Sequence, residues 1–298
     1  MAKARVIIKR RKAVRNIKKI TKVMQMIATS RYQKAFKRAM GTKPYVRKIG
    51  ELVASAVQAV RAGGKQVEHP LLKEPAGEKK AAVLVITSNR GLCGGYNGNV
   101  LRLASATLRE LEAAGDKPEL YVSGKKGSAY FRFQRRPIVQ SYTTVGDNPK
   151  FTEIEQIAEQ FMKAYQEGRI TGLKIVYMRF ISAGQQRHSI MDVLPLAAIA
   201  AAEQAVASVK VAPVPYDFMP SAEQILEELI PTTVKISVFQ AFIEAAVSEQ
   251  IARMVAMKAA TDNADKMGKK LTQDYNRARQ SQITSELSEL MGGVEALK

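Results

Sequence analysis

The sequence predicts an α+β protein in which two long helices from the chain ends form an antiparallel coiled coil and carry an inserted α/β domain. Residues 1–62 and 215–298 each show apolar or small side chains at alternating steps of three and four, the spacing of one helix face. Residues 78–195 instead alternate short apolar runs with helical segments, which is typical of an α/β domain. We therefore expect these three segments to be the domains.

The first fifty residues of the predicted N-terminal helix are strongly basic. Residues 1–50 contain seventeen of the 47 Lys and Arg and none of the 27 Asp and Glu. An apolar stripe runs through it, and we expect it to form one half of the coiled-coil seam. Its members are Ala13, Ile17, Ile20, Met24 and Ile27. Gly41 and Pro44 interrupt the pattern and predict a kink or a break, because proline removes a helical hydrogen bond.

The middle of the chain changes to strand patterns. Residues 81–87 are a continuous apolar run, as in a strand buried on both faces. Further strands are predicted at 119–123, 137–142, 173–181 and 187–194, with helices at 99–114, 125–132 and 151–167. This order predicts a small Rossmann-like domain with a largely parallel sheet, in which the last two strands form a hairpin. Residues 195–220 are predicted to be a connection.

The last third returns to helix. Apolar, small and polar side chains follow alternating steps of four and three for about forty residues, which is a left-handed coiled-coil seam. The series is Ile243, Val247, Gln250, Met254, Met257, Thr261, Ala264, Gly268, Leu271, Tyr275, Ala278 and Gln282. We expect it to pack against the N-terminal stripe. Gly292 and Gly293 are predicted to end or loosen the helix.

The turn at residues 87–98 follows a buried strand and opens a helix, where phosphate-binding loops lie. Its sequence, TSNRGLCGGYNG, lacks the Lys-Ser or Lys-Thr of a Walker A loop and the Gly-x-Gly-x-x-Gly spacing of a dinucleotide site. We therefore interpret Gly91, Gly94 and Gly95 as a structural turn. Cys93 is expected to be a buried small residue, because two histidines give little support for a Cys–His pair or a metal site. No catalytic residue, cofactor or metal is predicted.

The basic helix has three interpretations. A solvated face is one, although seventeen like charges without an acid repel one another strongly. Nucleic-acid binding is the second, and an acidic protein partner is the third. Composition alone slightly favours nucleic acid. A nucleotide-binding α/β enzyme is a further alternative.

Four blocks of sequence resemble the γ subunits of F-type ATP synthases of the bacterial type. They are IKKITKVMQMIATS at 17–30, SNRGLCGGYN at 88–97, EQIARMVAMKAATDN at 249–263 and YNRARQSQITSELSELMGGVEAL at 275–297. Their order and spacing match as well as their content, over essentially the whole chain. Val294 departs conservatively from the family pattern, which has Ala there. The single cysteine implies that the thiol regulation of plant chloroplast members is absent.

The resemblance implies a rotor subunit without a catalytic site, which couples proton-driven rotation of a c ring to ATP synthesis or hydrolysis on β subunits. Implied partners are three α and three β subunits, ε and the c ring, at the cytoplasmic face of the bacterial inner membrane. The residues implied to contact β are Lys18, Lys19, Lys22, Met24, Arg31, Glu249, Arg253, Arg279, Gln280 and Thr284. The seam residues are expected to be Ile17, Ile20, Ile27, Val247, Met254, Met257, Leu271 and Tyr275.

Overall fold

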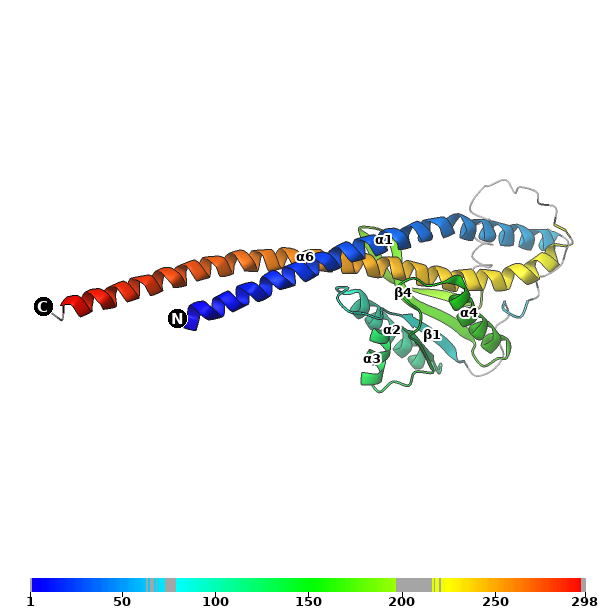
Figure 1. Cartoon of the computed structure of the whole chain (residues 1–298). Helices are drawn as coiled ribbons and strands as arrows, with labels where there is room; N and C mark the ends of the chain where they lie inside the picture. Colours follow the sequence, from blue (N-terminus) through cyan, green and yellow to red (C-terminus); the bar gives the residue numbers. More distant parts are fainter. Residues whose placement is uncertain are drawn as a thin grey trace. The chain divides into compact units, whose positions relative to one another are not determined.

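The structure is a computed structural model that describes residues 2–62, 64, 67, 69–72, 79–196, 216, 218, 219 and 221–295. Figure 1 shows its elements in sequence colours. The helices are α1 (Ala2–Ala62), α2 (Tyr96–Ala113), α3 (Lys125–Phe133), α4 (Phe151–Gln166) and α6 (Ala222–Glu295). The strands are β1 (Ala81–Ile86), β2 (Glu119–Ser123), β3 (Gln140–Tyr142), β4 (Gly172–Ser182) and β5 (Gln185–Leu194).

The chain divides into two compact units. Unit 1 consists of Met1–Ser30 and Arg253–Lys298, and unit 2 of Arg31–Ala252. Helices α1 and α6 each contribute to both units. Most of the predicted connection at residues 195–220 lies outside the described residues.

Unit 2 contains one five-stranded sheet with the order β3-β2-β1-β4-β5. Strand β1 is parallel to both β2 and β4, and β2 is parallel to β3. Strand β5 is antiparallel to β4. The predicted Rossmann-like sheet with a final hairpin is therefore confirmed, and the carboxyl ends of β1, β2 and β3 meet at one edge.

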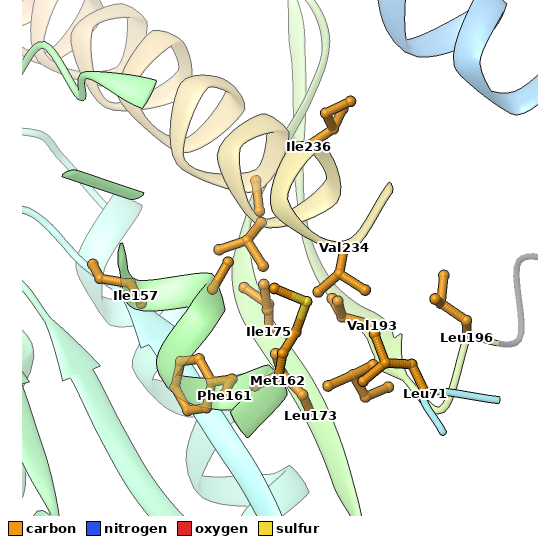
Figure 2. Packing of buried hydrophobic residues seen from close by; sticks show 14 of the residues in the cluster. Leu71, Ile157, Phe161, Met162, Leu173, Ile175, Val193, Leu196, Val234 and Ile236 are labelled. Carbon is orange, nitrogen blue, oxygen red and sulfur yellow. The ribbon is translucent and has the colours of Figure 1, made fainter. Parts of the chain in front are cut away.

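Both faces of the sheet are covered. Val83 and Val85 of β1 pack into a cluster with α2 and α3, whereas Ala82, Leu84 and Ile86 join the cluster on the opposite face. That second cluster, part of which Figure 2 shows, includes α4, the C-terminal half of α1 and the start of α6. Two-sided burial explains why the sequence of β1 is apolar at every position.

Polar contacts also join α6 to β4. The buried Glu244 carboxylate accepts a hydrogen bond from the Phe180 N–H at 3.3 Å and approaches the Tyr177 hydroxyl at 3.5 Å. One turn later, the Ser248 hydroxyl donates to the Met178 carbonyl at 3.2 Å. Burial and the Glu244 carboxylate raise the pKa of Tyr177, so the phenol stays protonated.

Two long helices are continuous where an interruption was one of the predicted alternatives. Helix α1 has no break at Gly41 or Pro44, and α6 does not end at Gly292 and Gly293 but continues to Glu295. Proline costs α1 a backbone hydrogen bond. Side chains on both sides of Pro44, such as Ala39 and Ile49, are buried in core clusters, and this packing stabilises the continuous helix.

Among the described residues, α6 is the one helix long and apolar enough to cross a membrane by length and composition alone. The share of its most apolar window that is buried inside the structure is 56%. This degree of burial is what the core helix of a folded domain shows.

Candidate functional site

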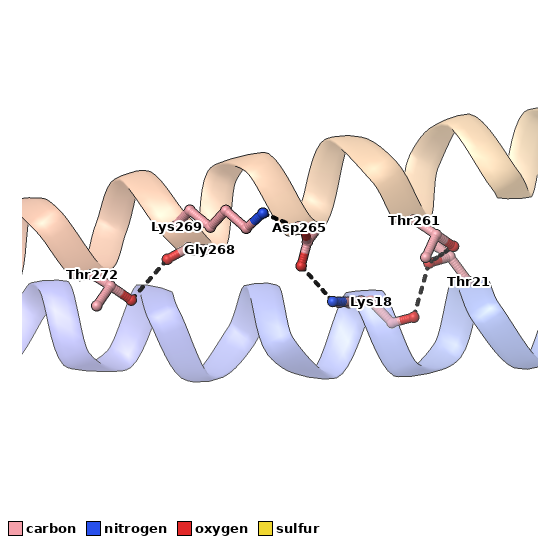
Figure 3. Close-up of polar contacts among 7 residues, drawn as sticks. All are labelled: Lys18, Thr21, Thr261, Asp265, Gly268, Lys269 and Thr272. Atoms are coloured by element: carbon pink, nitrogen blue, oxygen red, sulfur yellow. Dashed lines mark hydrogen bonds and ion pairs between the residues drawn. The ribbon is translucent and has the colours of Figure 1, made fainter.

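In unit 1, the two chain ends form an antiparallel helix pair. The Thr21 and Thr261 hydroxyls share a buried hydrogen bond of 2.8 Å. Towards the N-terminus of α1, Lys18 Nζ contacts the Asp265 carboxylate, as Figure 3 shows. The earlier α1 residue, Lys18, contacts the later α6 residue, Asp265, and Thr21 contacts Thr261, so the two helices run in opposite directions.

Charge complements this pairing. The hydrogen bond and charge of Lys18, followed by those of Lys269, hold the pKa of Asp265 below its usual value. The Arg11 guanidinium lies 5.1 Å above the centre of the Tyr275 ring, at cation–π distance. Because the Asp265 side chain is 40% exposed, the ion pair with Lys18 adds little stability and mainly favours one register of the helices.

The face of α1 that meets α6 differs from the predicted one. Ile17, Ile20 and Ile27 are 51%, 59% and 48% exposed, so their assignment to the coiled-coil seam is wrong. The buried positions are Val14, Thr21 and Ala28, with Lys18 and Gln25 between them in the same alternation of four and three. Every position of the true seam lies one residue after the predicted one, which rotates the contact face by about 100°.

The heptad positions of α6 lie on its more buried side. Val247 and Met257 are buried, whereas Met254, Leu271 and Tyr275 are partly exposed. At the level of α1 residues 14–21, the α6 positions are Thr261, Ala264 and Gly268. The α1 side chains that meet these α6 positions are Val14, Lys18 and Thr21, and the Thr21–Thr261 and Lys18–Asp265 contacts favour this face of α1 over the isoleucine face.

The outward surface of unit 1 is both basic and apolar. Lys19 and Lys22 are exposed, and Met24 is half-buried. Large apolar side chains are exposed on α1 at Val6, Ile17, Ile20, Val23, Met26 and Ile27, and on α6 at Val255, Met267, Ile283, Leu287, Leu290 and Met291. A helix that binds nucleic acid has no use for so much exposed apolar surface, whereas a protein interface does. The composition of this surface indicates a protein partner.

The remaining predicted contact residues fall into two groups. Arg279, Gln280 and Thr284 are exposed on α6, and the Thr284 hydroxyl donates to the Gln280 carbonyl at 3.0 Å. Glu249 and Arg253 are buried within the chain, which leaves little of their surface for another subunit. The contact of Glu249 and Arg253 with β subunits stays a prediction.

Arg31, another predicted contact residue, pairs with Asp147 in the loop between β3 and α4. This ion pair lies at the edge of a basic cavity. The sequence contained a signal for the cavity that we did not use, since Arg31, Lys34 and Arg38 follow steps of three and four on one face of α1.

The turn between β1 and α2 is held by its own side chains. The Asn97 amide accepts from the Ser88 N–H at 3.0 Å and donates to Cys93 Sγ at 3.2 Å. Gly94 has a φ of 56°, where glycine avoids the strain of a side chain. Gly91 and Gly95 flank this turn without a positive φ.

Donors that could hold a phosphate are already occupied here. At the start of α3, the N–H of Lys125 donates to the Asn89 side chain and that of Lys126 to the Ser88 carbonyl. The Gly127 N–H donates to the Thr87 hydroxyl at 2.9 Å. With its first-turn donors satisfied, this helix start has no anion cradle.

Cys93 is buried, and its Sγ contacts the Ser88 hydroxyl, the Asn97 amide and the Arg90 carbonyl. Within the part of the chain that the structure describes, no group of three or more His, Cys, Asp or Glu side chains could hold a metal ion.

Comparison with known proteins gives the family. The ATP synthase family matches residues 3–297. The ATP synthase gamma chain of Rhodopirellula baltica is 43% identical over the full length of both chains. That of Saccharopolyspora erythraea is 39% identical over 100% of this chain and 98% of its own.

Solved structures share the fold. A chain of the Euglena gracilis mitochondrial ATP synthase, in a structure of OSCP, F1 and c-ring, superposes with a TM-score of 0.67 at 20% identity. The match covers 99% of this chain and 95% of that chain. A chain from the central stalk and c-ring of the Tetrahymena thermophila enzyme gives 0.56 at 23% identity, over 81% and 99%. The full-length sequence matches, together with this fold, show that the chain belongs to the γ-chain family of F-type ATP synthases.

Proposed function

We propose that this chain is the central rotor shaft of an F-type ATP synthase. Protons passing through the membrane sector turn a c ring, the ring turns this chain, and the chain drives β subunits through the conformations that make or hydrolyse ATP. The chain supplies no catalytic group, cofactor or metal ligand of its own. Its partners are three α and three β subunits, ε and the c ring.

One observation carries the proposal: the helix pair of unit 1 exposes basic and large apolar side chains together. Such a surface requires an enclosing protein partner, because exposed apolar groups favour burial and the unopposed charges favour acidic groups. The solved structures similar to this chain come from a central stalk and a rotor, which agrees with this requirement.

The place of the chain follows from the same assignment. As part of a membrane ATP synthase it is peripheral, and we place it at the cytoplasmic face of a bacterial inner membrane. The sheet of unit 2 would bind ε and the c ring, whereas the helix pair of unit 1 would turn inside the ring of α and β. Lys19, Lys22, Arg279, Gln280 and Thr284 are the exposed residues that we assign to contacts with β.

Weak exposed contacts suit a surface that must turn. An exposed ion pair contributes about 0–1 kcal/mol, so a rotating shaft can exchange such contacts one after another without a deep energy minimum. Lys18 is less suited to this exchange than its neighbours, because it already pairs with Asp265 within the chain.

Co-purification tests the assembly. We expect the full chain, tagged and produced with α, β and ε from the same source, to purify with about three copies each of α and β. Purification of the tagged chain without them would overturn the proposal.

Charge reversal tests the contact surface. The double variant Lys19→Glu with Lys22→Glu should assemble but lose most proton-coupled ATP synthesis in reconstituted vesicles. The control Lys19→Arg with Lys22→Arg keeps both positive charges at the same exposed positions and should keep proton-coupled ATP synthesis. Equal ATP synthesis in both double variants would show that the charges of Lys19 and Lys22 do not contribute to the contact with β subunits.

A further inference from the structure

A basic cavity of about 660 Å³ opens at the carboxyl ends of β1, β2 and β3. Arg90 follows β1, Lys125 follows β2, and the loop at residues 143–148 follows β3. In open α/β sheets, the crevice at the carboxyl ends of parallel strands is where ligands bind. The volume is within the usual range for small-molecule sites.

The charge of the cavity favours an anion. Arg31, Lys34 and Arg38 of α1 line one side, and with Arg90 and Lys125 they bring five basic groups around the space. Two carboxylates, Asp147 and Glu153, also line it, which leaves a net excess of three positive charges. Asp147 already pairs with Arg31.

The lining also indicates which part of a ligand would be recognised. Thr143, Thr144 and Asn148 add hydroxyl and amide groups that can bind phosphate oxygens, and none of the described lining residues is aromatic. A nucleobase would therefore have no ring on which to stack. Because the first-turn N–H groups of α3 are already bonded within the protein, side chains would have to make the contacts.

We propose that this cavity binds an oligophosphate, either the triphosphate chain of a nucleotide or inorganic tripolyphosphate, through Arg31, Lys34, Arg38, Arg90 and Lys125. The site recognises the charge and geometry of the phosphate groups, and its affinity does not depend on the nucleobase. It is separate from the rotor function proposed above, and its failure would leave that function untouched.

Calorimetric titration of the full chain with tripolyphosphate, ATP and adenosine tests the proposal. Tripolyphosphate and ATP should bind one per chain with similar affinity, adenosine should not bind, and the affinity should fall steeply as salt is added. Absence of saturable binding at low ionic strength would overturn the site. ATP binding more than about tenfold tighter than tripolyphosphate would overturn recognition by phosphate alone.

Four variants locate the binding. Lys34→Gln and Lys125→Gln each remove one exposed charge and should weaken binding about fivefold. Asp147→Asn removes a competing carboxylate and frees Arg31, so it should tighten binding. Lys12→Gln is the matched control in the basic part of unit 1, outside the cavity, and should change nothing. If Lys12→Gln weakens binding as much as Lys34→Gln, the ligand is held by diffuse basic charge and the proposed site is wrong.

Discussion

At the scale of single residues, Gly124 shows how the strand-to-helix turns are fixed. It follows β2 with a φ of 98°, and a Cβ there would overlap the Thr87 carbonyl oxygen. The Thr87 hydroxyl in turn donates to the Ser123 carbonyl at 2.8 Å and accepts from the Gly127 N–H. The two turns at the carboxyl ends of β1 and β2 are therefore built against each other.

Substitution of Gly124 should be costly. We expect Gly124→Ala to lower the free energy of unfolding by about 2–5 kcal/mol, through steric overlap and strain at positive φ. The control is Gly98→Ala in the exposed first turns of α2, where a Cβ meets nothing within 4 Å. It should raise stability by up to about 1 kcal/mol through better helix propensity. Urea denaturation measures both, and equal effects of the two substitutions would contradict this role of Gly124.

His69 gives the fold a pH dependence. Burial lowers the pKa of His69, against the opposing effect of the Glu227 carboxylate, and its Nδ1 accepts from the Leu71 N–H at 3.1 Å. Below pH 6.5 the unfolded chain therefore binds more protons at this residue than the folded chain does. The stability contributed by neutral His69 is present above that pH and is lost as the pH falls through it.

The variant His69→Asn isolates this effect, because an Asn side chain can accept the same N–H two residues on without titrating. Stability should fall less between pH 7 and pH 5 in this variant than in the unchanged chain. His188→Asn, which removes the other of the two histidines, should keep the full pH dependence. A wild-type pH profile in His69→Asn would show that another group is responsible.

At the scale of elements, the two long helices differ in how far their sequences predict their packing. Helix α6 has one periodic series, and its contact side follows that series. Helix α1 has two faces that could pack against α6. One is an apolar stripe through Ile20, and the other is a face of small and polar residues through Thr21. Periodicity identifies an apolar face but does not say whether this chain or a partner covers it.

The sheet was easier to predict, because each strand carries its own signal. The all-apolar run of β1 requires cover on both faces, and helices alternate with the parallel strands as expected. The basic cavity was missed for the opposite reason. Its residues come from α1, from the starts of α3 and α4 and from the loops after β1 and β3, and only the folded sheet brings them together.

The corrected seam can be tested by amide hydrogen exchange along residues 10–28. Val14→Ala removes buried contacts worth about 1–2 kcal/mol, so exchange in this segment should become roughly 5 to 30 times faster. Ile20→Ala changes an exposed position and should alter exchange by less than about threefold. If Ile20→Ala accelerated exchange as much as Val14→Ala, the predicted seam through Ile20 would be correct and the seam through Val14 would be wrong.

At the scale of the whole molecule, charge and apolar surface are distributed for assembly. The chain carries a formal net charge of +20, and residues 1–50 hold seventeen basic groups without an acid. Lys18 and Arg31 find carboxylates within the chain, whereas Lys19 and Lys22 remain exposed. Charges of this density repel one another, and acidic partners around the helix pair would relieve the repulsion.

Rotation is the central claim, and a single label can test it. Cys93 is the chain's one cysteine and is buried, so Gln134→Cys at the exposed end of α3 gives a unique attachment point for a probe. The α and β subunits of the assembled complex are fixed to a surface. The account then predicts that ATP hydrolysis rotates the probe in one direction, in steps of about 120° set by the three β subunits. A probe that stays fixed relative to α and β while ATP is hydrolysed would contradict the account.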